Sequence, residues 1–519
     1  MNQPDWQSLL RTGIAEIGRQ QGEEARLHLA EAYRMAPAER DVRYWLANAL
    51  RLCAQPVAAE HMFRQLATEF PQDVDIAFAL AFLLRAEGRP AEASGVLVQM
   101  AHAHEGDLAT LLKVAGFLRD SDQYNDAISV MHMALDKAPD DASLHLKLAR
   151  LYQAMGQFDA ALGLLRKAVR INPRLGTAWL LLAHMQRFSD NTSSDWQLIE
   201  QAAQQPLGDE ADMCLAFARG KGLDDMGRWQ SAWKEICRGN QLRNTAQPWD
   251  TLAWKQQLAR SLQVASPSPA PGKNSGRHPV FIMGMLRSGT TVLEQMLDRH
   301  PGITARGELN FLAHLAKEGP ETMPPDETAR IARNKQALGN ELWTRLRLDG
   351  PQQQRYVDKN PLNFRFIGFL LRILPEARII HVTRDGRDSC LSCFFQLLQH
   401  PDAGFSNNLD DLLDYYRGYR QVMDRWCRLA GDRIHTVSYD DLVRETRPTL
   451  EGVLDFLGLG WDAAMENDRA DTRPVRTASS WQARQPLHQR SLSRWQNYYA
   501  MAPGFFDAIA EVDQATGAS

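Results

Sequence analysis

The sequence has few cysteines for its length, little net charge and no long apolar run. The six cysteines among 519 residues are scattered and do not form the dense framework of a small secreted domain. The net charge of −4 gives no bulk attraction to nucleic acid or to an acidic membrane surface. No run approaches the ~18 consecutive apolar residues of a membrane-spanning helix, and the first residues do not resemble a secretory signal. We therefore expect a soluble, cytoplasmic chain that binds neither nucleic acid nor a membrane.

A metal-binding pattern is also missing. Cys390 and Cys393 form a C-x-x-C pair, but no second pair completes a zinc site. These two cysteines are predicted to pack within a helix, and no metal cofactor is expected.

A 34-residue period runs through the first half of the chain. Alanines recur at this spacing, at Ala25, Ala59, Ala93, Ala127 and Ala161. The period is typical of tetratricopeptide repeats, in which two antiparallel helices cross closely at small residues. We predict an α-solenoid over residues 1–260 with a concave groove that binds a peptide or protein. The alternative is a scaffold without a defined ligand, or a module that assembles the chain into homo-oligomers.

A linker is predicted to separate this solenoid from a second domain. Residues 261–277 contain prolines, serines and glycines and lose the 34-residue period. In residues 278–519, strand-like apolar runs are followed by tight turns and helix starts. Such segments are typical of α/β folds, which place their ligand groups at strand ends.

An anion-binding loop opens the second domain. An apolar run ends at Gly284, and Gly289 follows five residues later, ahead of Thr290 and Thr291. Glycines let backbone amides approach an anion at a helix N-terminus. The spacing is that of a P-loop, but Thr290 stands where such loops carry lysine. The nearest cation is Arg287, within the turn, so a nucleotide without a β/γ-phosphate pair fits better than ATP.

This loop resembles the 5′-phosphosulfate loop of sulfotransferases, which use 3′-phosphoadenosine 5′-phosphosulfate (PAPS). Residues 377–392 resemble the family's 3′-phosphate segment, which implies that Arg384 and Ser392 hold the 3′-phosphate. The resemblance covers residues 278–519 and is greatest to tyrosylprotein sulfotransferases and to bacterial sulfotransferases with tetratricopeptide repeats. It implies that these residues form a P-loop-like α/β sulfotransferase domain with a central parallel sheet. The residues implied for the 5′-phosphosulfate are Arg287, Ser288, Gly289, Thr290 and Thr291.

The resemblance also implies three catalytic residues. Glu308 stands where the tyrosylprotein enzymes carry their catalytic glutamate, and would accept the proton of the acceptor hydroxyl. Lys359 resembles the family's lysine near the transferred sulfuryl group, whose charge it would stabilise together with Arg287. His300 and His314 are rival candidates for the base.

Further matches complete the implied nucleotide site. Tyr439 resembles a tyrosine that contacts the nucleotide. A C-terminal segment resembles the one that folds over the nucleotide and contributes Ser479, Arg484 and Arg494. The sequence departs from the tyrosylprotein pattern at Asn310, where an arginine near the acceptor is expected, and at Gln396.

These features predict a PAPS-dependent sulfotransferase that works without a metal and releases 3′-phosphoadenosine 5′-phosphate (PAP). The favoured acceptor is a tyrosine in a peptide or protein, although a small-molecule or sugar hydroxyl would use the same machinery. Two other classes stay open. A P-loop kinase with Asp385 as metal ligand is disfavoured by the missing lysine. A repeat scaffold with an inactive transferase domain is disfavoured by the intact set of site residues.

Overall fold

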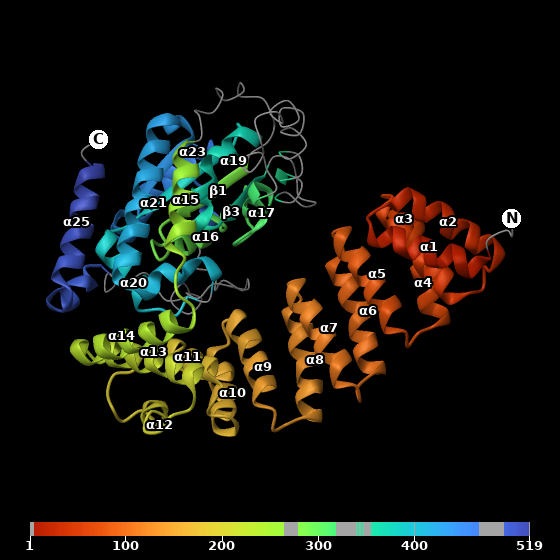
Figure 1. Cartoon of the computed structure of the whole chain (residues 1–519), viewed down its shortest axis with the longest axis horizontal. Coiled ribbons are helices and arrows are strands. Elements are labelled where there is room, and N and C mark those ends of the chain that lie inside the picture. The colour runs from red at the N-terminus through yellow and green to blue at the C-terminus, as the bar shows by residue number, and fades with distance from the viewer. Residues whose placement is uncertain are drawn as a thin grey trace. The chain divides into compact units, whose positions relative to one another are not determined.

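The computed structural model describes residues 5–263, 279–317, 354–398, 400–466 and 492–517, together with 339, 342, 343 and 346. The chain divides into two compact units, Met1–Leu164 and Leu165–Ser519 (Figure 1). Among the described residues, no helix combines the length and the apolar character needed to cross a membrane.

The first unit consists of helix pairs that recur every 34 residues. First helices begin at residues 6, 40, 74, 108 and 142, and second helices at residues 22, 56, 90, 124 and 158. The bounds are α1 (Trp6–Gly18), α2 (Gly22–Met35), α3 (Arg40–Leu52), α4 (Pro56–Glu69), α5 (Val74–Ala86), α6 (Pro90–Ala103), α7 (Leu108–Asp120), α8 (Tyr124–Lys137), α9 (Ala142–Ala154) and α10 (Phe158–Ile171), whose last residues enter the second unit. The predicted solenoid of tetratricopeptide repeats is confirmed.

Small and capping residues explain why these segments pair. The five alanines of the sequence pattern stand at the fourth position of the second helices, and each has 0% of its surface exposed. A larger side chain at these positions would push the paired helices apart. Four first helices begin after an aspartate whose side chain accepts a backbone N–H, which satisfies groups that a helix start leaves open. These aspartates are Asp5, Asp73, Asp107 and Asp141.

Five helices open the second unit. They are α11 (Gly176–His184), α12 (Ser194–Ala202), α13 (Asp209–Asp225), α14 (Trp229–Ala246) and α15 (Thr251–Gln263). The ring of Trp254 on α15 lies 4.4 Å from that of Tyr415, and the hydroxyl of Ser261 donates to the carbonyl of Arg365 at 2.8 Å. Helix α15 therefore packs on the α/β part of the unit. Most of the predicted linker lies outside the described residues, and the predicted domain division stays a prediction.

The α/β part is built on five parallel strands in the order β2-β3-β1-β4-β5. The strands are β1 (Pro279–Gly284), β2 (Ile303–Ala305), β3 (Arg355–Lys359), β4 (Arg378–Thr383) and β5 (Ile434–Ser438). The register pairs Ile282 of β1 with Lys359 of β3 and Ile380 of β4. The predicted parallel sheet is confirmed.

Helices cover both faces of this sheet, as its buried strands require. Residues of α16, α22 and α23 pack with Val280 and Ile282 on one face. On the other face, Nε2 of His381 lies 2.6 Å from the hydroxyl of Tyr419 on α21. The α-helices are α16 (Thr290–Leu297), α17 (Phe311–Lys317), α19 (Ile367–Ile373), α20 (Gly386–Phe394), α21 (Leu409–Leu429), α22 (Tyr439–Arg444), α23 (Thr446–Leu457) and α25 (Pro503–Gly517). The 3-10 helices are η3 (Pro361–Phe366), η4 (Pro401–Asn407), η5 (Gly431–Arg433), η6 (Ala463–Glu466) and η8 (Arg494–Met501).

Chain direction places the carboxyl ends of all five strands at one edge of the sheet. β1 lies between β3 and β4, so the connections from the central strands diverge there. Open α/β sheets bind their ligands in the crevice outside such a point. This edge is where a site is expected.

Candidate active site

The loop from β1 to α16 has the geometry of an anion cradle. Gly289 adopts φ +102° and caps α16, a backbone conformation that favours glycine. A Cβ at Gly289 would collide with the ring of Tyr439, and one at Gly284 would collide with the carbonyl oxygen of Val382. The hydroxyl of Ser288 is fully buried and has no hydrogen-bond partner among the described residues. A buried hydroxyl in a glycine-bracketed loop at a helix start fits an anionic oxygen.

Arg287 links this loop to the segment after β4. Its Nε donates a hydrogen bond to the hydroxyl of Ser392 on α20 at 3.0 Å, and its carbonyl oxygen accepts one from Nη1 of Arg384 at 3.1 Å. The guanidinium carbon of Arg384 lies 5.2 Å from the centre of the Tyr439 ring. The structure therefore brings together four residues that the sequence predicted for the nucleotide.

The backbone and charge of Arg287 are both unusual. Its φ of +69° is rare for a residue with a side chain, and such strain is concentrated at functional sites. Burial, together with the nearby charges of Arg384 and Arg494, lowers the pKa of Arg287 to about 10. The guanidinium remains a cation at neutral pH, surrounded by other cations, which is the setting in which a bound anion is most stabilising.

Glu308 and Lys359 form the second part of the site. Nζ of Lys359 lies 2.5 Å from Oε1 of Glu308. Lys359 ends β3, whereas Glu308 follows the neighbouring strand β2, so the parallel pairing of the two strands brings them together. The lysine side chain is 0% exposed and the glutamate side chain is 45% exposed. The ion pair therefore presents its carboxylate to solvent, where a substrate hydroxyl can reach it.

Two buried carboxylates beside this pair carry no role in the sequence analysis. Burial raises the pKa of Glu294, on α16, and that of Asp358, on β3, to about 7 in each case, against a lowering effect of Lys359. Glu294 accepts the N–H of Gly307, and Asp358 accepts the N–H of Leu309. Asp358 could have been found from its place beside Lys359 at a strand end. Glu294 gives no local signal, because a glutamate in an amphipathic helix is usually exposed.

The rival bases are placed differently. Nε2 of His300 lies 3.0 Å from the carbonyl oxygen of Gly460, and its Nδ1 accepts the N–H of Gly302 at 2.9 Å. Both ring nitrogens are thus engaged by the backbone, which leaves no lone pair for a substrate proton. His314 lies on the exposed face of α17.

The C-terminal residues predicted for the nucleotide are described only in part. Ser479 and Arg484 lie outside the described residues. The guanidinium of Arg494 makes an ion pair with Asp224 of α13 at 2.8 Å and lies 4.7 Å from the centre of the Phe395 ring. Its role in binding the nucleotide stays a prediction.

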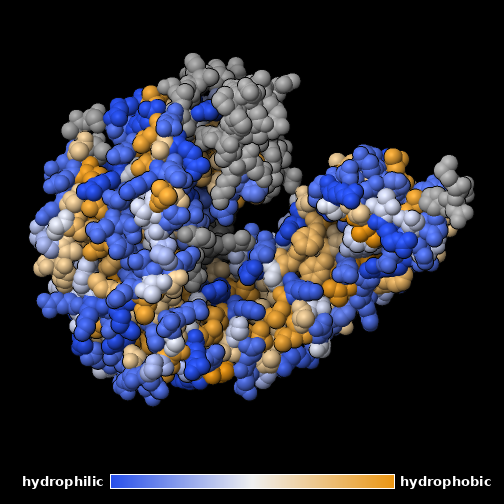
Figure 2. Space-filling view, in the orientation of Figure 1, coloured by the Kyte–Doolittle hydropathy of each residue, from blue (hydrophilic) through white to orange (hydrophobic). Residues whose placement is uncertain are grey.

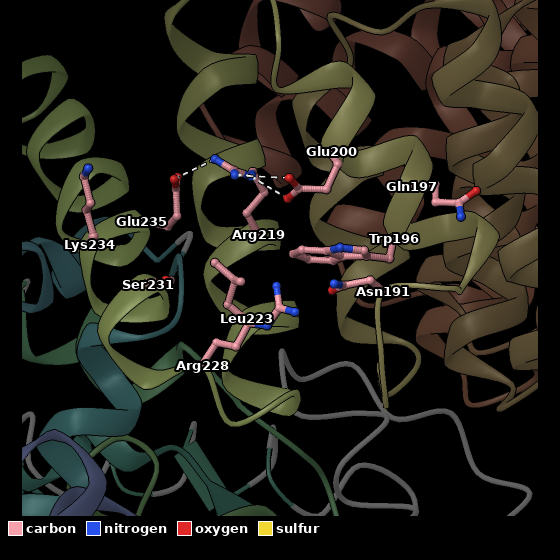
Figure 3. A pocket seen from close by; sticks show the side chains of 10 residues that line it. All are labelled: Asn191, Trp196, Gln197, Glu200, Arg219, Leu223, Arg228, Ser231, Lys234 and Glu235. Carbon is pink, nitrogen blue, oxygen red and sulfur yellow. Dashed lines mark hydrogen bonds and ion pairs between the residues drawn. The ribbon is translucent and has the colours of Figure 1, made fainter.

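A separate cavity of about 550 Å³ lies between α12, α13 and α14 (Figure 3). Arg219 joins the three helices there, because its Nε lies 3.0 Å from Glu200 and its Nη1 lies 2.6 Å from Glu235. The lining residues are Asn191, Trp196, Gln197, Glu200, Arg219, Leu223, Arg228, Ser231, Lys234 and Glu235. None of them is a predicted site residue, so the cavity is distinct from the candidate active site.

The part of the chain that the structure describes contains no group of three or more histidine, cysteine, aspartate or glutamate residues able to hold a metal ion. Cys390 and Cys393 are buried within α20, and Sγ of Cys393 lies 3.4 Å from the carbonyl oxygen of Leu286. Burial raises the pKa of Cys393 to about 12, so the protonated thiol packs against the anion-binding loop.

The fold and site define a P-loop-like α/β domain that follows helical repeats. Residues 279–463 match the model of the sulfotransferase family, and residues 118–185 match that of the tetratricopeptide repeat. The chain therefore carries a sulfotransferase-family domain and tetratricopeptide repeats.

Curated relatives are similar to part of the chain at low identity. An uncharacterised protein from Aquifex aeolicus is 27% identical over 302 residues, which cover 54% of this chain and 39% of that protein. Protein-tyrosine sulfotransferase 2 from Gallus gallus is 26% identical over 233 residues, 42% of this chain and 62% of that protein. Protein-tyrosine sulfotransferase from Drosophila melanogaster is 26% identical over 243 residues, 42% of this chain and 46% of that protein. The chain thus spans less than two thirds of each relative's length.

Two solved structures are similar to part of the chain. The sulfotransferase domain from the Synechococcus PCC 7002 olefin synthase is 20% identical with a TM-score of 0.27, and the match covers 44% of this chain and 98% of that one. MamA MSR-1 is 20% identical with a TM-score of 0.25, covering 33% of this chain and 97% of that one. Both TM-scores are low.

Proposed function

We propose that the second unit transfers a sulfuryl group from PAPS to the hydroxyl of a tyrosine in a peptide or protein. The observation that carries the proposal is the placement of five residues at one edge of the sheet. Each follows or ends a different strand: Arg287 follows β1, Glu308 follows β2, Lys359 ends β3, Arg384 follows β4 and Tyr439 follows β5. Parallel pairing brings these loops, which are far apart in the sequence, to the edge where open α/β sheets bind their ligands. The side chains found there, two arginines, a lysine, a glutamate and a tyrosine, are of the types that bind a charged nucleotide and take a proton.

The charges around the loop after β1 indicate which nucleotide serves as the donor. Arg287 and Arg384 offer planar, multiply hydrogen-bonding cations that suit phosphate and sulfate oxygens. The buried hydroxyl of Ser288 supplies a further donor. Because Thr290 replaces the P-loop lysine, the loop does not have the usual clamp for a β/γ-phosphate pair. A nucleotide with one group at the 5′ position and a second phosphate elsewhere fits better.

The chemistry then follows from the two parts of the site. The acceptor oxygen bonds to sulfur as the bond between sulfur and the phosphate oxygen breaks, and that oxygen keeps the electron pair in the departing PAP. Glu308 takes the proton that the acceptor hydroxyl loses. Lys359 and Arg287 stabilise the charge that spreads over the transferred group and the leaving oxygen. Burial of Lys359 strengthens this effect, because water does not screen a buried charge.

A peptide acceptor is supported by the repeats and by the relatives that are named for protein tyrosine. On the first unit, Phe82 of α5 is 47% exposed, and its ring lies 4.9 Å from that of Phe117 on α7. The guanidinium carbon of Arg85 lies 4.5 Å from the centre of the Phe117 ring. Apolar surface is visible over the repeats in Figure 2. Phe117 is buried, so the exposed part of this cluster is the ring of Phe82 with Arg85 beside it. An exposed aromatic ring with an arginine beside it is typical of peptide-binding surfaces.

Calorimetric titration with PAP, and separately with ATP and magnesium, tests the donor. Tight PAP binding that needs no metal, together with weak ATP binding, is expected. ATP binding stronger than PAP binding would identify a kinase-like site instead, and the absence of both would leave a repeat scaffold with an inactive domain.

A further inference from the structure

The peptide that carries Glu308 is held by hydrogen bonds on its N-terminal side. Oε1 of Glu294 accepts the N–H of Gly307 at 3.0 Å, and the carbonyl oxygen of Gly307 accepts the N–H of Lys359 at 2.9 Å. Gly307 has φ +69°, so the chain turns sharply just before Glu308. A sharp turn held from both sides leaves little freedom to the residue that follows it.

The C-terminal side of Glu308 is held in the same manner. Oδ1 of Asp358 accepts the N–H of Leu309 at 3.2 Å, and Nδ2 of Asn360 donates to the carbonyl oxygen of Leu309 at 3.2 Å. The other oxygen of Asp358 accepts a hydrogen bond from Nδ2 of Asn363 at 3.0 Å. Both backbone neighbours of Glu308 are therefore fixed, while its own side chain is partly exposed.

Glu294 has a position that packing alone does not explain. It is 7% exposed, and an apolar residue there would avoid the cost of burying a carboxylate. The charge of Lys359, the residue that contacts Glu308 directly, lowers the pKa of Glu294 against the larger effect of burial. One side chain from α16 thus touches the backbone before Glu308 and lies within the electrostatic reach of the lysine that pairs with Glu308. Because α16 begins at the anion-binding loop, the same helix connects the donor site with the base.

We propose that Glu294 is a positioning residue for Glu308: it fixes the Gly307 amide, and so directs the Glu308 carboxylate toward the acceptor hydroxyl. Asp358 holds Leu309 as its counterpart on the other side. This inference rests on the proposed function, in which Glu308 accepts the proton. Misplacing a reacting group by about 1 Å lowers the rate on the order of 100-fold. The hydrogen bond between Glu294 and the Gly307 amide should therefore affect turnover.

Two substitutions at Glu294 distinguish the effect of the hydrogen bond from the effect of side-chain volume. Glu294→Ala removes the acceptor of the Gly307 N–H, and we expect kcat to fall ~10- to 100-fold while PAP affinity stays within about threefold. Glu294→Gln keeps an acceptor oxygen of the same reach and should restore most of kcat. Gln295→Ala, on the same helix, is the matched control and should leave kcat within about threefold. Equal kcat in Glu294→Ala and the wild type would overturn the inference.

A double-mutant cycle shows whether Glu294 acts through Glu308. In a Glu308→Ala background, Glu294→Ala should change the residual kcat by less than about twofold, because the group to be positioned is gone. A full ~10- to 100-fold loss in that background would show that Glu294 acts on something else. If Glu294→Ala does not fold, Glu294→Asp takes its place in the cycle, because the shorter side chain keeps the charge and loses the reach to Gly307.

Hydrogen exchange gives a readout that does not need turnover. The Gly307 amide should exchange at least ~10-fold faster in Glu294→Ala than in the wild type and at a near wild-type rate in Glu294→Gln. If the Gly307 amide exchanges at the same rate in Glu294→Ala as in the wild type, Glu294 does not fix this amide, even if the wild type is an active sulfotransferase. A wild-type chain that binds PAP and transfers nothing refutes the proposed function and, with it, the role assigned to Glu294.

Discussion

Nε of Arg287 lies 3.0 Å from the hydroxyl of Ser392, and this hydrogen bond joins the loop after β1 to the helix after β4. The two residues are 105 positions apart and were predicted to bind opposite ends of one nucleotide. Their contact means that the two anion-binding segments form one continuous surface. On the proposed function, the 5′-phosphosulfate and the 3′-phosphate are bound by groups that already hold one another in place.

Arg384→Ala should weaken PAP binding. The guanidinium donates to the Arg287 carbonyl and stacks by Tyr439, so its loss removes a cation and a support of the loop. A hydrogen bond to a charged group contributes about 1.5–3 kcal/mol, which corresponds to a ~10- to 100-fold rise in the Kd of PAP by calorimetry. The matched control is Arg378→Ala, at the opposite end of the same strand, where PAP affinity should not change.

Glu308→Ala should remove turnover but not donor binding. A general base contributes ~10²- to 10⁴-fold, so kcat should fall by that amount while the Kd of PAP stays within a few-fold. Single-turnover transfer from labelled PAPS measures the first quantity and calorimetry the second. Retained turnover would refute the assignment of Glu308 as the base, and a parallel loss of PAP affinity would make it a binding residue instead.

Local rules allowed much of this account to be predicted from the sequence. The repeat helices follow from a 34-residue spacing of small and capping residues, because each pair contacts mainly its neighbours. The site at the strand ends follows from parallel pairing, which puts every loop after a strand at one edge. Glu308 and Lys359 lie in contact for this reason, although 51 residues separate them in the sequence.

Tertiary contacts decided the features that were not predicted. Glu294 is buried only because the chain returns 13 residues later and lays Gly307 against it. The ion pair between Arg494 and Asp224 spans 270 residues, and no local pattern indicates that the C-terminal segment packs on α13. The packing of α15 on α21 was not predicted either, because a repeat helix and a helix that packs on another domain have similar spacings of apolar residues.

Glu294→Gln should change the dependence of stability on pH. Burial raises the pKa of Glu294 from 4.5 to about 7, so the native state binds this proton more tightly than the unfolded state. Between these two pH values, stability therefore falls as pH rises, by up to about 3 kcal/mol from this group. Glutamine does not titrate, so the Glu294→Gln variant should not lose this part of its stability as the pH rises.

Thermal unfolding at about pH 5 and about pH 8 measures this effect. The Tm of Glu294→Gln relative to wild type should be higher at the alkaline pH than at the acidic one. Glu24→Gln, on the exposed surface of α2, is the control and should give the same difference at both pH values. A constant difference for Glu294→Gln would contradict the raised pKa.

Ala54→Gly should stabilise the repeats. Ala54 has φ +54° in the turn after α3, whereas Gly88 occupies the equivalent place after α5 with φ +75°. Glycine relieves the strain of the left-handed backbone conformation, and this effect is larger than the stability lost because glycine gives the unfolded chain more freedom. The free energy of unfolding should therefore rise by about 0.5–1 kcal/mol. The reverse change, Gly88→Ala, should lower Tm. A fall in Tm for Ala54→Gly would show that the turn is not strained.

Phe82→Ala should weaken the capture of a peptide acceptor. The exposed ring of Phe82 on α5 packs against the buried ring of Phe117 on α7, and its loss should raise KM for a peptide several-fold with PAP affinity unchanged. Val57→Ala removes an apolar side chain that is 81% exposed on α4 and serves as the control. Equal effects of the two substitutions on KM would argue against a specific peptide surface there.

Transfer of labelled sulfate from PAPS to a tyrosine peptide tests the central claim most directly. The account predicts label on the tyrosine peptide, none on the same peptide with phenylalanine in place of tyrosine, and transfer at least ~100-fold slower with the Glu308→Ala variant. Tight PAP binding without label on either peptide, but with label on a small-molecule or sugar hydroxyl, would contradict the tyrosine acceptor; no transfer to any hydroxyl would contradict the sulfotransferase itself.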